Sequence, residues 1–243
     1  MKIGSNVVTD GLIFYVDAAN TNSYIPDNTI VDSMVSEFTG SLINDVAFNS
    51  SPPSNFEFGL SGVDDYIDFG EASDSSFTSS FDPQTNNYTA NIFFKIDSDN
   101  ATTAVIMGKG CGSSSIKGWL IWYSNSTGIL NYRVSGKGTL GNQDPSQRAN
   151  VEFSINKNQI YMSTFVIDRT NNQIIGYLNG RNPQTASISG FDPFISPYKF
   201  LIGTRHQLNL SLNGNVYLAQ IYNRALSAKE VLQNYNALKN RFN

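Results

Sequence analysis

The chain is poor in the residues that build disulfides, zinc sites and proton relays. Its 243 residues include one cysteine, Cys111, and one histidine, His206. A single cysteine excludes an internal disulfide, and a single histidine excludes the usual zinc clusters and histidine relays. Charge is also scarce, with 16 Lys and Arg against 20 Asp and Glu, and the basic residues are scattered. The electrostatic footprint of a nucleic-acid-binding protein is therefore missing, and we expect no nucleic-acid partner.

Long apolar runs and nucleophile motifs are missing as well. No segment approaches the roughly 18 consecutive apolar residues of a membrane span, so we expect no membrane span. The first six residues lack the apolar stretch of a secretory signal. The nucleophile motif G-x-S-x-G does not occur either. We predict no catalytic residues and no cofactor.

Short alternating segments separated by turn residues fill most of the chain instead. This pattern is typical of an antiparallel sandwich. Residues 160–168 and 173–178 alternate in this way around a polar turn and are predicted to pair, and Asn179-Gly180 favours a tight hairpin into the next strand. Because 40% hydrophobic content over this length allows one large core, we predict an N-terminal arm at residues 1–10 and a single domain at residues 11–243.

The C-terminal run at residues 212–238 joins a strand to a capped helix. Strict alternation places Val216 and Leu218 on one side of the strand and Tyr217 and Ala219 on the other, so the strand is predicted to be covered on both faces. Ser227-Ala228-Lys229-Glu230 then has the form of a capping box. A helix is predicted to start there, with an apolar stripe at Val231, Leu232, Tyr235, Leu238 and Phe242.

Several of these segments together resemble a known family. Residues 212–238, residues 61–67 (SGVDDYI) and residues 88–96 (YTANIFFKI) are similar to characteristic strands of the concanavalin A-like lectin/glucanase, or laminin-G-like, domains. Residues 105–110, 118–123, 129–134, 173–181 and 200–203 follow in the order of that family. The resemblance implies an all-β fold, an antiparallel two-sheet jelly-roll sandwich with a short C-terminal α-helix.

A second resemblance lies at the front of the chain. Residues 8–24 (VTDGLIFYVDAANTNSY) are similar to an opening phrase of tailed-bacteriophage structural proteins that carry such a domain. This resemblance implies localisation in a virion, with other virion proteins as partners. It also implies a homo-oligomer or attachment to a capsid or tail lattice, where the N-terminal arm could hold a neighbouring subunit.

The catalytic motif of the glucanase branch is absent. That branch places its two carboxylates on one strand as E-x-D-x-x-E. The chain has five glutamates, and no two of them are five residues apart. Glycoside hydrolase activity would need an unrelated acid pair assembled across loops, and it is the third and least favoured hypothesis.

The calcium positions of the family are also replaced. Where pentraxin-like relatives carry an acidic run, this chain has Thr204-Arg205-His206-Gln207, whose positive or neutral groups cannot replace those acidic calcium ligands. The acidic pair that often precedes the C-terminal motif is replaced by Tyr217-Leu218. Asp64 and Asp65 remain and are interpreted as turn caps. We therefore predict no metal site.

Sugar binding in this fold needs an aromatic face together with groups that match hydroxyls. Trp119 and Trp122 are three residues apart on a predicted strand, so they lie on opposite faces and at most one points into the core. The candidate carbohydrate-binding residues, drawn from strand and loop regions that meet in relatives, are Trp122, Tyr123, Asn142, Gln143, Asp144, Arg205 and His206.

Two hypotheses of function follow from these residues and resemblances. The first is a non-enzymatic, lectin-like protein on the surface of a bacteriophage virion, which binds glycans for adhesion. The second is a purely structural capsid decoration or tail or fibre protein that has kept the sandwich and lost the sugar site. Binding to glycans separates the two, since a fold alone does not determine a function.

Overall fold

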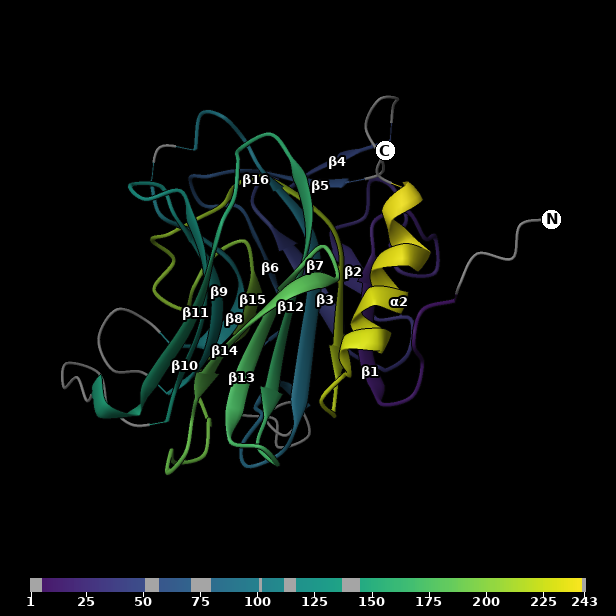
Figure 1. Cartoon of the computed structure of the whole chain (residues 1–243). Coiled ribbons are helices and arrows are strands. Elements are labelled where there is room, and N and C mark those ends of the chain that lie inside the picture. The colour runs from purple at the N-terminus through teal and green to yellow at the C-terminus, as the bar shows by residue number, and fades with distance from the viewer. Residues whose placement is uncertain are drawn as a thin grey trace.

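The computed structural model describes residues 6–50, 57–70, 80–100, 102–111, 117–136 and 145–241. Two antiparallel sheets, each of eight strands, face each other and enclose one hydrophobic core (Figure 1). A short helix, α2 (Ala228–Leu238), follows the last strand. The predicted fold class, an antiparallel two-sheet sandwich with a C-terminal helix, is confirmed, whereas the predicted domain boundaries stay a prediction.

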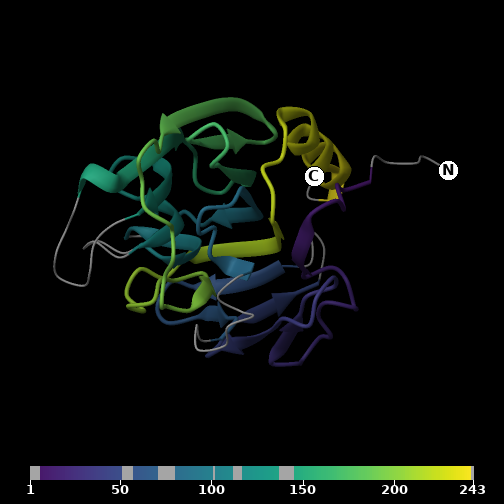
Figure 2. The ribbon, with the colours of Figure 1, turned by 90° about the horizontal axis from the view of Figure 1, so that it is seen from below.

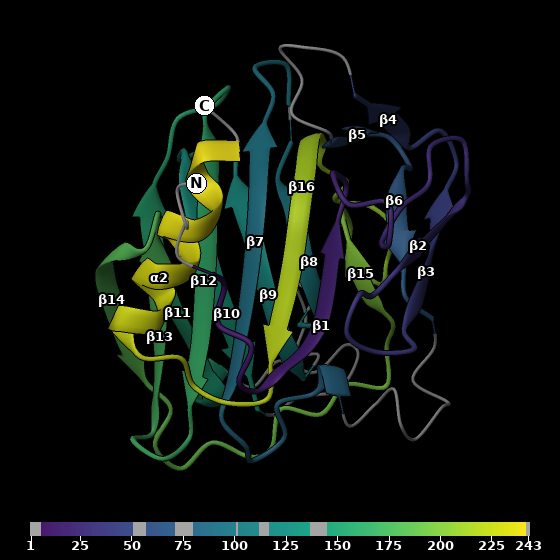
Figure 3. The same ribbon diagram turned by 90° about the vertical axis from the view of Figure 1, so that its right-hand side faces the viewer.

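Sheet A carries the helix on its outer face (Figure 3). Its order is β14 (Arg181–Ser187), β13 (Gln173–Leu178), β12 (Ile160–Asp168), β7 (Tyr88–Ile96), β16 (Asn213–Tyr222), β5 (Glu57–Ser61) and β4 (Ala47–Asn49), with β1 (Leu12–Asp17) paired to β16. The predicted pairing of β12 with β13 is confirmed. Asn179 and Gly180, at φ 52° and 72°, form the two-residue turn from β13 to β14, as their sequence predicts.

Sheet B forms the opposite layer of the sandwich. Its order is β11 (Arg148–Ser154), β10 (Ile129–Ser135), β9 (Gly118–Ser124), β8 (Ala104–Gly110), β15 (Phe200–Ile202), β6 (Tyr66–Asp68), β3 (Thr39–Ile43) and β2 (Ile30–Asp32). Two short 3-10 turns are also present, η1 (Pro145–Gln147) before β11 and η2 (Lys239–Arg241) after α2.

Strand β16 is covered on both faces, as predicted, but its alternation is interrupted. The register against β7 shifts between Val216 and Leu218. Val216 and Ala219 therefore face the core between the sheets, whereas Tyr217 and Leu218 both pack on the α2 side. The prediction that Val216 and Leu218 share a face is wrong, because a β-bulge places an extra residue on one strand.

The start of α2 has the predicted capping box. Ser227 Oγ accepts from the Glu230 N–H at 3.4 Å, and Glu230 Oε2 accepts from the Ser227 N–H at 2.8 Å. Val231 and Leu238 are buried against sheet A, which confirms these two positions of the apolar stripe, while Phe242 lies outside the described residues. Among the residues that the structure describes, no helix is long and apolar enough to cross a membrane.

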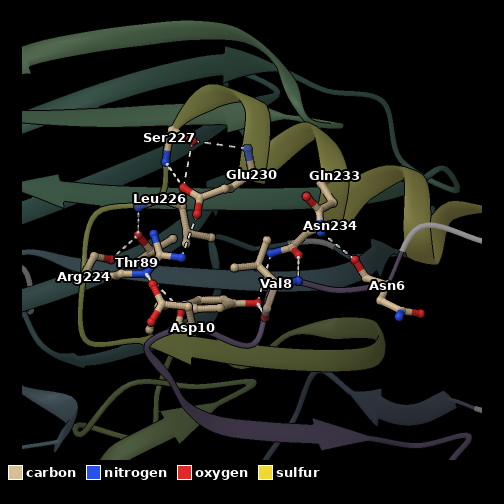
Figure 4. Close-up of polar contacts among 11 residues, drawn as sticks. Asn6, Val8, Asp10, Thr89, Arg224, Leu226, Ser227, Glu230, Gln233 and Asn234 are labelled. Atoms are coloured by element: carbon tan, nitrogen blue, oxygen red, sulfur yellow. Dashed lines mark hydrogen bonds and ion pairs between the residues drawn. The ribbon is translucent and has the colours of Figure 1, made fainter.

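Residues 6–10 of the expected arm lie along α2 of the same chain (Figures 2 and 4). The Val8 N–H donates to Asn234 Oδ1 at 2.8 Å, and the Tyr222 hydroxyl donates to the Val8 carbonyl at 3.0 Å. Gln233 Nε2 donates to the Asn6 carbonyl at 2.9 Å. This part of the arm thus belongs to the layer that covers sheet A, and contact of the arm with a neighbouring subunit stays a prediction.

Candidate functional site

The two tryptophans of β9 point to opposite faces of sheet B, as their spacing predicts. Trp119 is fully buried in the core, and its indole N–H donates to the Phe81 carbonyl at 2.8 Å. Trp122 is partly buried on the outer face, against the small apolar cluster of Val105, Cys111 and Leu120. This face looks away from α2 (Figure 1). Trp122 is therefore the tryptophan that is placed to meet a ligand.

A cavity of about 320 Å³ lies over this face of sheet B. Strand register sets its floor, because Trp122 lies opposite Val105 of β8, and Leu120 lies opposite Arg133 of β10. Cys111, just after β8, lines the cavity as well, together with Thr103, Arg205 and Leu210. We call this cavity the Trp122 pocket.

The loop after β15 forms one wall of the Trp122 pocket. The Val105 N–H donates to the Leu210 carbonyl at 2.8 Å, which ties the loop to the start of β8. Within the loop, Arg205 Nε donates to Asn209 Oδ1 at 2.7 Å. Arg205, at only 8% exposure, is thus held at the cavity. The predicted residues Trp122 and Arg205 are brought together, although 83 positions separate them in the sequence.

Arg133 is a site residue that the sequence interpretation missed. Its guanidinium lies over the Trp122 ring, 5.1 Å from the ring centroid, and its Nε donates to Asn150 Oδ1 at 2.8 Å. Burial lowers the pKa of both Arg133 and Arg205. The sequence signal that could have found Arg133 is the turn at residues 125–128. This turn predicts that β10 returns beside β9, so that side chains of β10 also lie on the outer face.

Of the other candidate residues, Tyr123 does not line the Trp122 pocket. Tyr123 is 3% exposed and packs in the core, and its role as a sugar-binding residue stays a prediction. Neighbours on a strand point to opposite faces, so Tyr123 and Trp122 lie on opposite sides of sheet B. Asn142, Gln143 and Asp144 lie outside the described residues, and their roles stay predictions.

His206 lies beside Arg205 but does not line the Trp122 pocket. Its ring packs on Tyr198, with ring centroids 4.1 Å apart. Both imidazole nitrogens are buried and have no hydrogen-bond partner among the described residues. The structure therefore gives His206 an environment that favours the neutral form, and its role in ligand binding stays a prediction.

Acid should destabilise the protein through His206. Burial, with a smaller contribution from the charge of Arg205, lowers the pKa of His206 to about 4 from the usual 6.5. The unfolded chain therefore binds this proton at higher pH than the folded protein, and the free energy of unfolding falls as pH drops from about 6.5 to 4. A titration of the single imidazole by NMR should give a pKa near 4, and a value near 6.5 would contradict the burial argument.

The variant His206→Phe provides the matched control for this titration. Phenylalanine can keep the ring contact with Tyr198 but has no proton to gain. The difference in unfolding free energy between wild type and variant should therefore depend on pH between about 6.5 and 4 and be flat above it. A constant difference across that window would assign the acid sensitivity to other groups.

A second cavity, of about 390 Å³, lies at one end of the sandwich near Asp82 and Tyr88. Tyr88 is only 3% exposed. Arg224, also in its lining, is already bound to the Asp10 carbonyl at 2.9 Å and to Glu230 at 2.7 Å (Figure 4). This cavity offers amide groups without an accessible aromatic face, so the Trp122 pocket is the better platform for a sugar ring.

Asp65, one of the two acids that remain in the family pattern, bonds to backbone N–H groups. Asp65 Oδ2 accepts from the Ser61 N–H at 2.8 Å, and Asp65 Oδ1 accepts from the Asp45 N–H at 3.3 Å. This agrees with the interpretation of Asp65 as a turn cap. In the part of the chain that the structure describes, no three His, Cys, Asp or Glu side chains come together as metal ligands.

Comparisons with known proteins agree with this architecture. No curated protein matches the sequence. Among solved structures, the sialidase of Trypanosoma rangeli in complex with sialic acid is 15% identical, with a TM-score of 0.67, over 99% of this chain and 36% of the sialidase. The receptor binding domain of botulinum neurotoxin C/D mosaic serotype is 15% identical, with a TM-score of 0.69, over 95% of this chain and 52% of that chain.

These solved structures are longer than this protein, which spans about a third of the sialidase and about half of the toxin domain. At such low identity the likeness shows the fold alone. The sequence match to a family is more specific, because it covers residues 61–232 and thus most of both sheets and the start of α2. The chain belongs to the concanavalin A-like lectin/glucanases superfamily.

Proposed function

We propose that the protein is a non-enzymatic, lectin-like module that binds glycans in the Trp122 pocket. The observation that carries this proposal is the position of Trp122, a partly exposed ring on the outer face of sheet B, next to Arg133 and Arg205. An indole face packs against the apolar side of a sugar ring, and guanidinium groups donate hydrogen bonds to its oxygens. The pocket therefore combines the two kinds of contact that a sugar needs.

The change Trp122→Ala should abolish glycan binding. Removing the ring removes the apolar platform, and we expect affinity to fall by about 30-fold or more, in line with a buried aromatic anchor. The measurement is a glycan array probed with wild type and variant, followed by titration of the strongest ligand. Trp122→Phe should keep part of the affinity, and equal binding by all three proteins would place the site elsewhere.

The known structures with this fold support a binding role. One is described as a receptor binding domain, and another is a sialidase in complex with sialic acid. The absence of an E-x-D-x-x-E strand favours binding over hydrolysis. Glycoside hydrolase activity is therefore the least favoured proposal, and release of sugar from a bound glycan would be the result that revives it.

We further propose that the protein is displayed on a bacteriophage virion. The support is the phage-like opening phrase at residues 8–24. Residues 12–17 of that phrase form β1, which pairs with β16 in sheet A, so the phrase is part of the sandwich. Mass spectrometry and labelling of purified particles test this location, and absence of the protein from intact particles would overturn it.

A purely structural role in the virion is the second candidate function. Ile30 on the edge strand β2 is 41% exposed. Ile25 precedes this strand and Val35 follows it, and they are 61% and 45% exposed. Exposed apolar side chains at a sheet edge are suited to contact with another protein. A capsid, tail or fibre lattice, or a second copy of this chain, could cover them. Particles that contain the protein, together with no glycan binding, would favour this candidate.

A further inference from the structure

The charged side chains of the Trp122 pocket are all of one sign. Among the described residues that line it, Arg133 and Arg205 are charged, and none is a carboxylate. Burial raises the pKa of the lining thiol, Cys111, to about 12, so this group is neutral. The described lining thus offers two cationic donors and no carboxylate to pair with them.

Two charged residues of the neighbouring strand β11 also act on Arg133. Glu152 acts on Arg133 from the outer strand β11, where it lies opposite Asn131. Arg148, on the same strand, acts in the opposite sense and adds positive charge near Arg133 and Cys111. The charges of Arg148 and Glu152 therefore act on the pKa of Arg133 in opposite directions, so these two residues together supply no clear counter charge.

The arginines are also held in place by neutral partners. Arg133 Nε donates to Asn150 Oδ1 and Arg205 Nε donates to Asn209 Oδ1, both amide oxygens. These bonds orient each guanidinium without neutralising it. Guanidinium groups fixed in this way match the two oxygens of a carboxylate or a sulfate group.

We propose that the glycan bound in the Trp122 pocket is acidic, with an anionic carboxylate or sulfate group held by Arg133 and Arg205 beside a ring packed on Trp122. This inference rests on the proposed function and names its ligand class. A neutral sugar would displace water from two cationic groups without supplying a negative charge to pair with them, which costs free energy in a partly buried site. An anionic group returns charge-assisted hydrogen bonds, which are roughly twice as strong as neutral ones.

The test compares sugars that differ at one group. A β-glucoside, a β-glucuronide and a β-glucoside 6-sulfate, each attached through the same linker at the anomeric oxygen, are displayed densely on a sensor surface and probed with the full chain in low salt. We expect one or both acidic probes to bind about tenfold more tightly than the neutral probe, and added salt to weaken that preference. The two acidic arms show whether carboxylate or sulfate is preferred.

Variants assign the preference to the two arginines. Arg205→Gln and Arg133→Gln should each reduce the acidic preference toward onefold while the proteins stay folded by circular dichroism. Arg181→Gln, at an exposed arginine of β14 in sheet A, is the matched control and should change nothing. If one glutamine variant does not fold, the other still tests the proposal.

The outcomes separate this inference from the proposed function. Trp122-dependent binding with equal affinity for neutral and acidic probes would overturn the acidic specificity and leave glycan binding in place. An acidic preference that survives both glutamine variants would also overturn it, because other groups would then hold the anion. No binding to these probes or to any glycan on an array would overturn both proposals.

Discussion

Asp82→Ala is expected to destabilise the protein by about 3–5 kcal/mol, because it leaves a buried ammonium group without its counterion. The side chains of Lys109 and Asp82 are both 0% exposed, and Lys109 Nζ lies 2.5 Å from Asp82 Oδ2. The other bond of Lys109 is to the Ser196 carbonyl at 2.9 Å. Burial lowers the pKa of Lys109, and loss of Asp82 would lower it further. Urea unfolding followed by circular dichroism measures the cost.

A double variant separates the pair interaction from simple loss of packing. Replacing both partners by apolar residues, as in Asp82→Leu with Lys109→Met, removes the stranded charge and should recover most of the lost stability. Recovery is expected because Lys109 lies opposite Phe200 of β15 and Trp119 of β9, two aromatic residues of the core. A loss below about 1 kcal/mol in Asp82→Ala would show that Lys109 finds another partner or is neutral in the folded protein.

The second large effect is expected at Gly118, the first residue of β9. A Cβ atom built on Gly118 would lie 2.0 Å from the Lys109 carbonyl oxygen of the neighbouring strand β8. Its φ of +129° is also unfavourable for a residue with a side chain. Gly118→Ala should therefore cost about 3 kcal/mol or more, since backbone strain and overpacking add, and it should loosen the pairing that supports Trp122.

Gly190→Ala is the matched control for this prediction. Gly190 also has a positive φ, at +76°, but a Cβ atom there would meet nothing within 4 Å. The control isolates the cost of placing a side chain at a positive φ, for which we expect a loss of stability of about 1 kcal/mol. Thermal and urea unfolding of both variants give the comparison, and equal losses would mean that the contact with the Lys109 carbonyl is relieved by a small backbone shift.

Local sequence signals predicted the helix and the hairpin well. The Ser227 and Glu230 capping box and the Asn179-Gly180 turn depend on contacts between residues close in sequence, so their patterns can be recognised without a structure. The bulge in β16 could not be predicted, because it arises from register against β7, a strand more than 100 positions away. Alternation alone therefore misplaced Val216 relative to Leu218.

The candidate site likewise has parts that local sequence predicts and parts that depend on distant contacts. Strand periodicity separated Trp119 from Trp122, and the same rule places the Tyr123 side chain on the core face with Trp119. Arg133 depends on the return of β10 beside β9, a pairing that the sequence indicates only through the turn at residues 125–128. The approach of Arg205 depends on how a long loop folds, which periodicity does not describe.

The most direct test of the account is an NMR titration of the two indole N–H signals with the strongest ligand found on the array. The Trp119 N–H is bonded to the Phe81 carbonyl in the core, whereas the Trp122 N–H has no acceptor among the described residues. The account predicts that the Trp122 signal shifts with ligand while the Trp119 signal stays in place. Binding that leaves the Trp122 signal unchanged would contradict a glycan site on the outer face of sheet B.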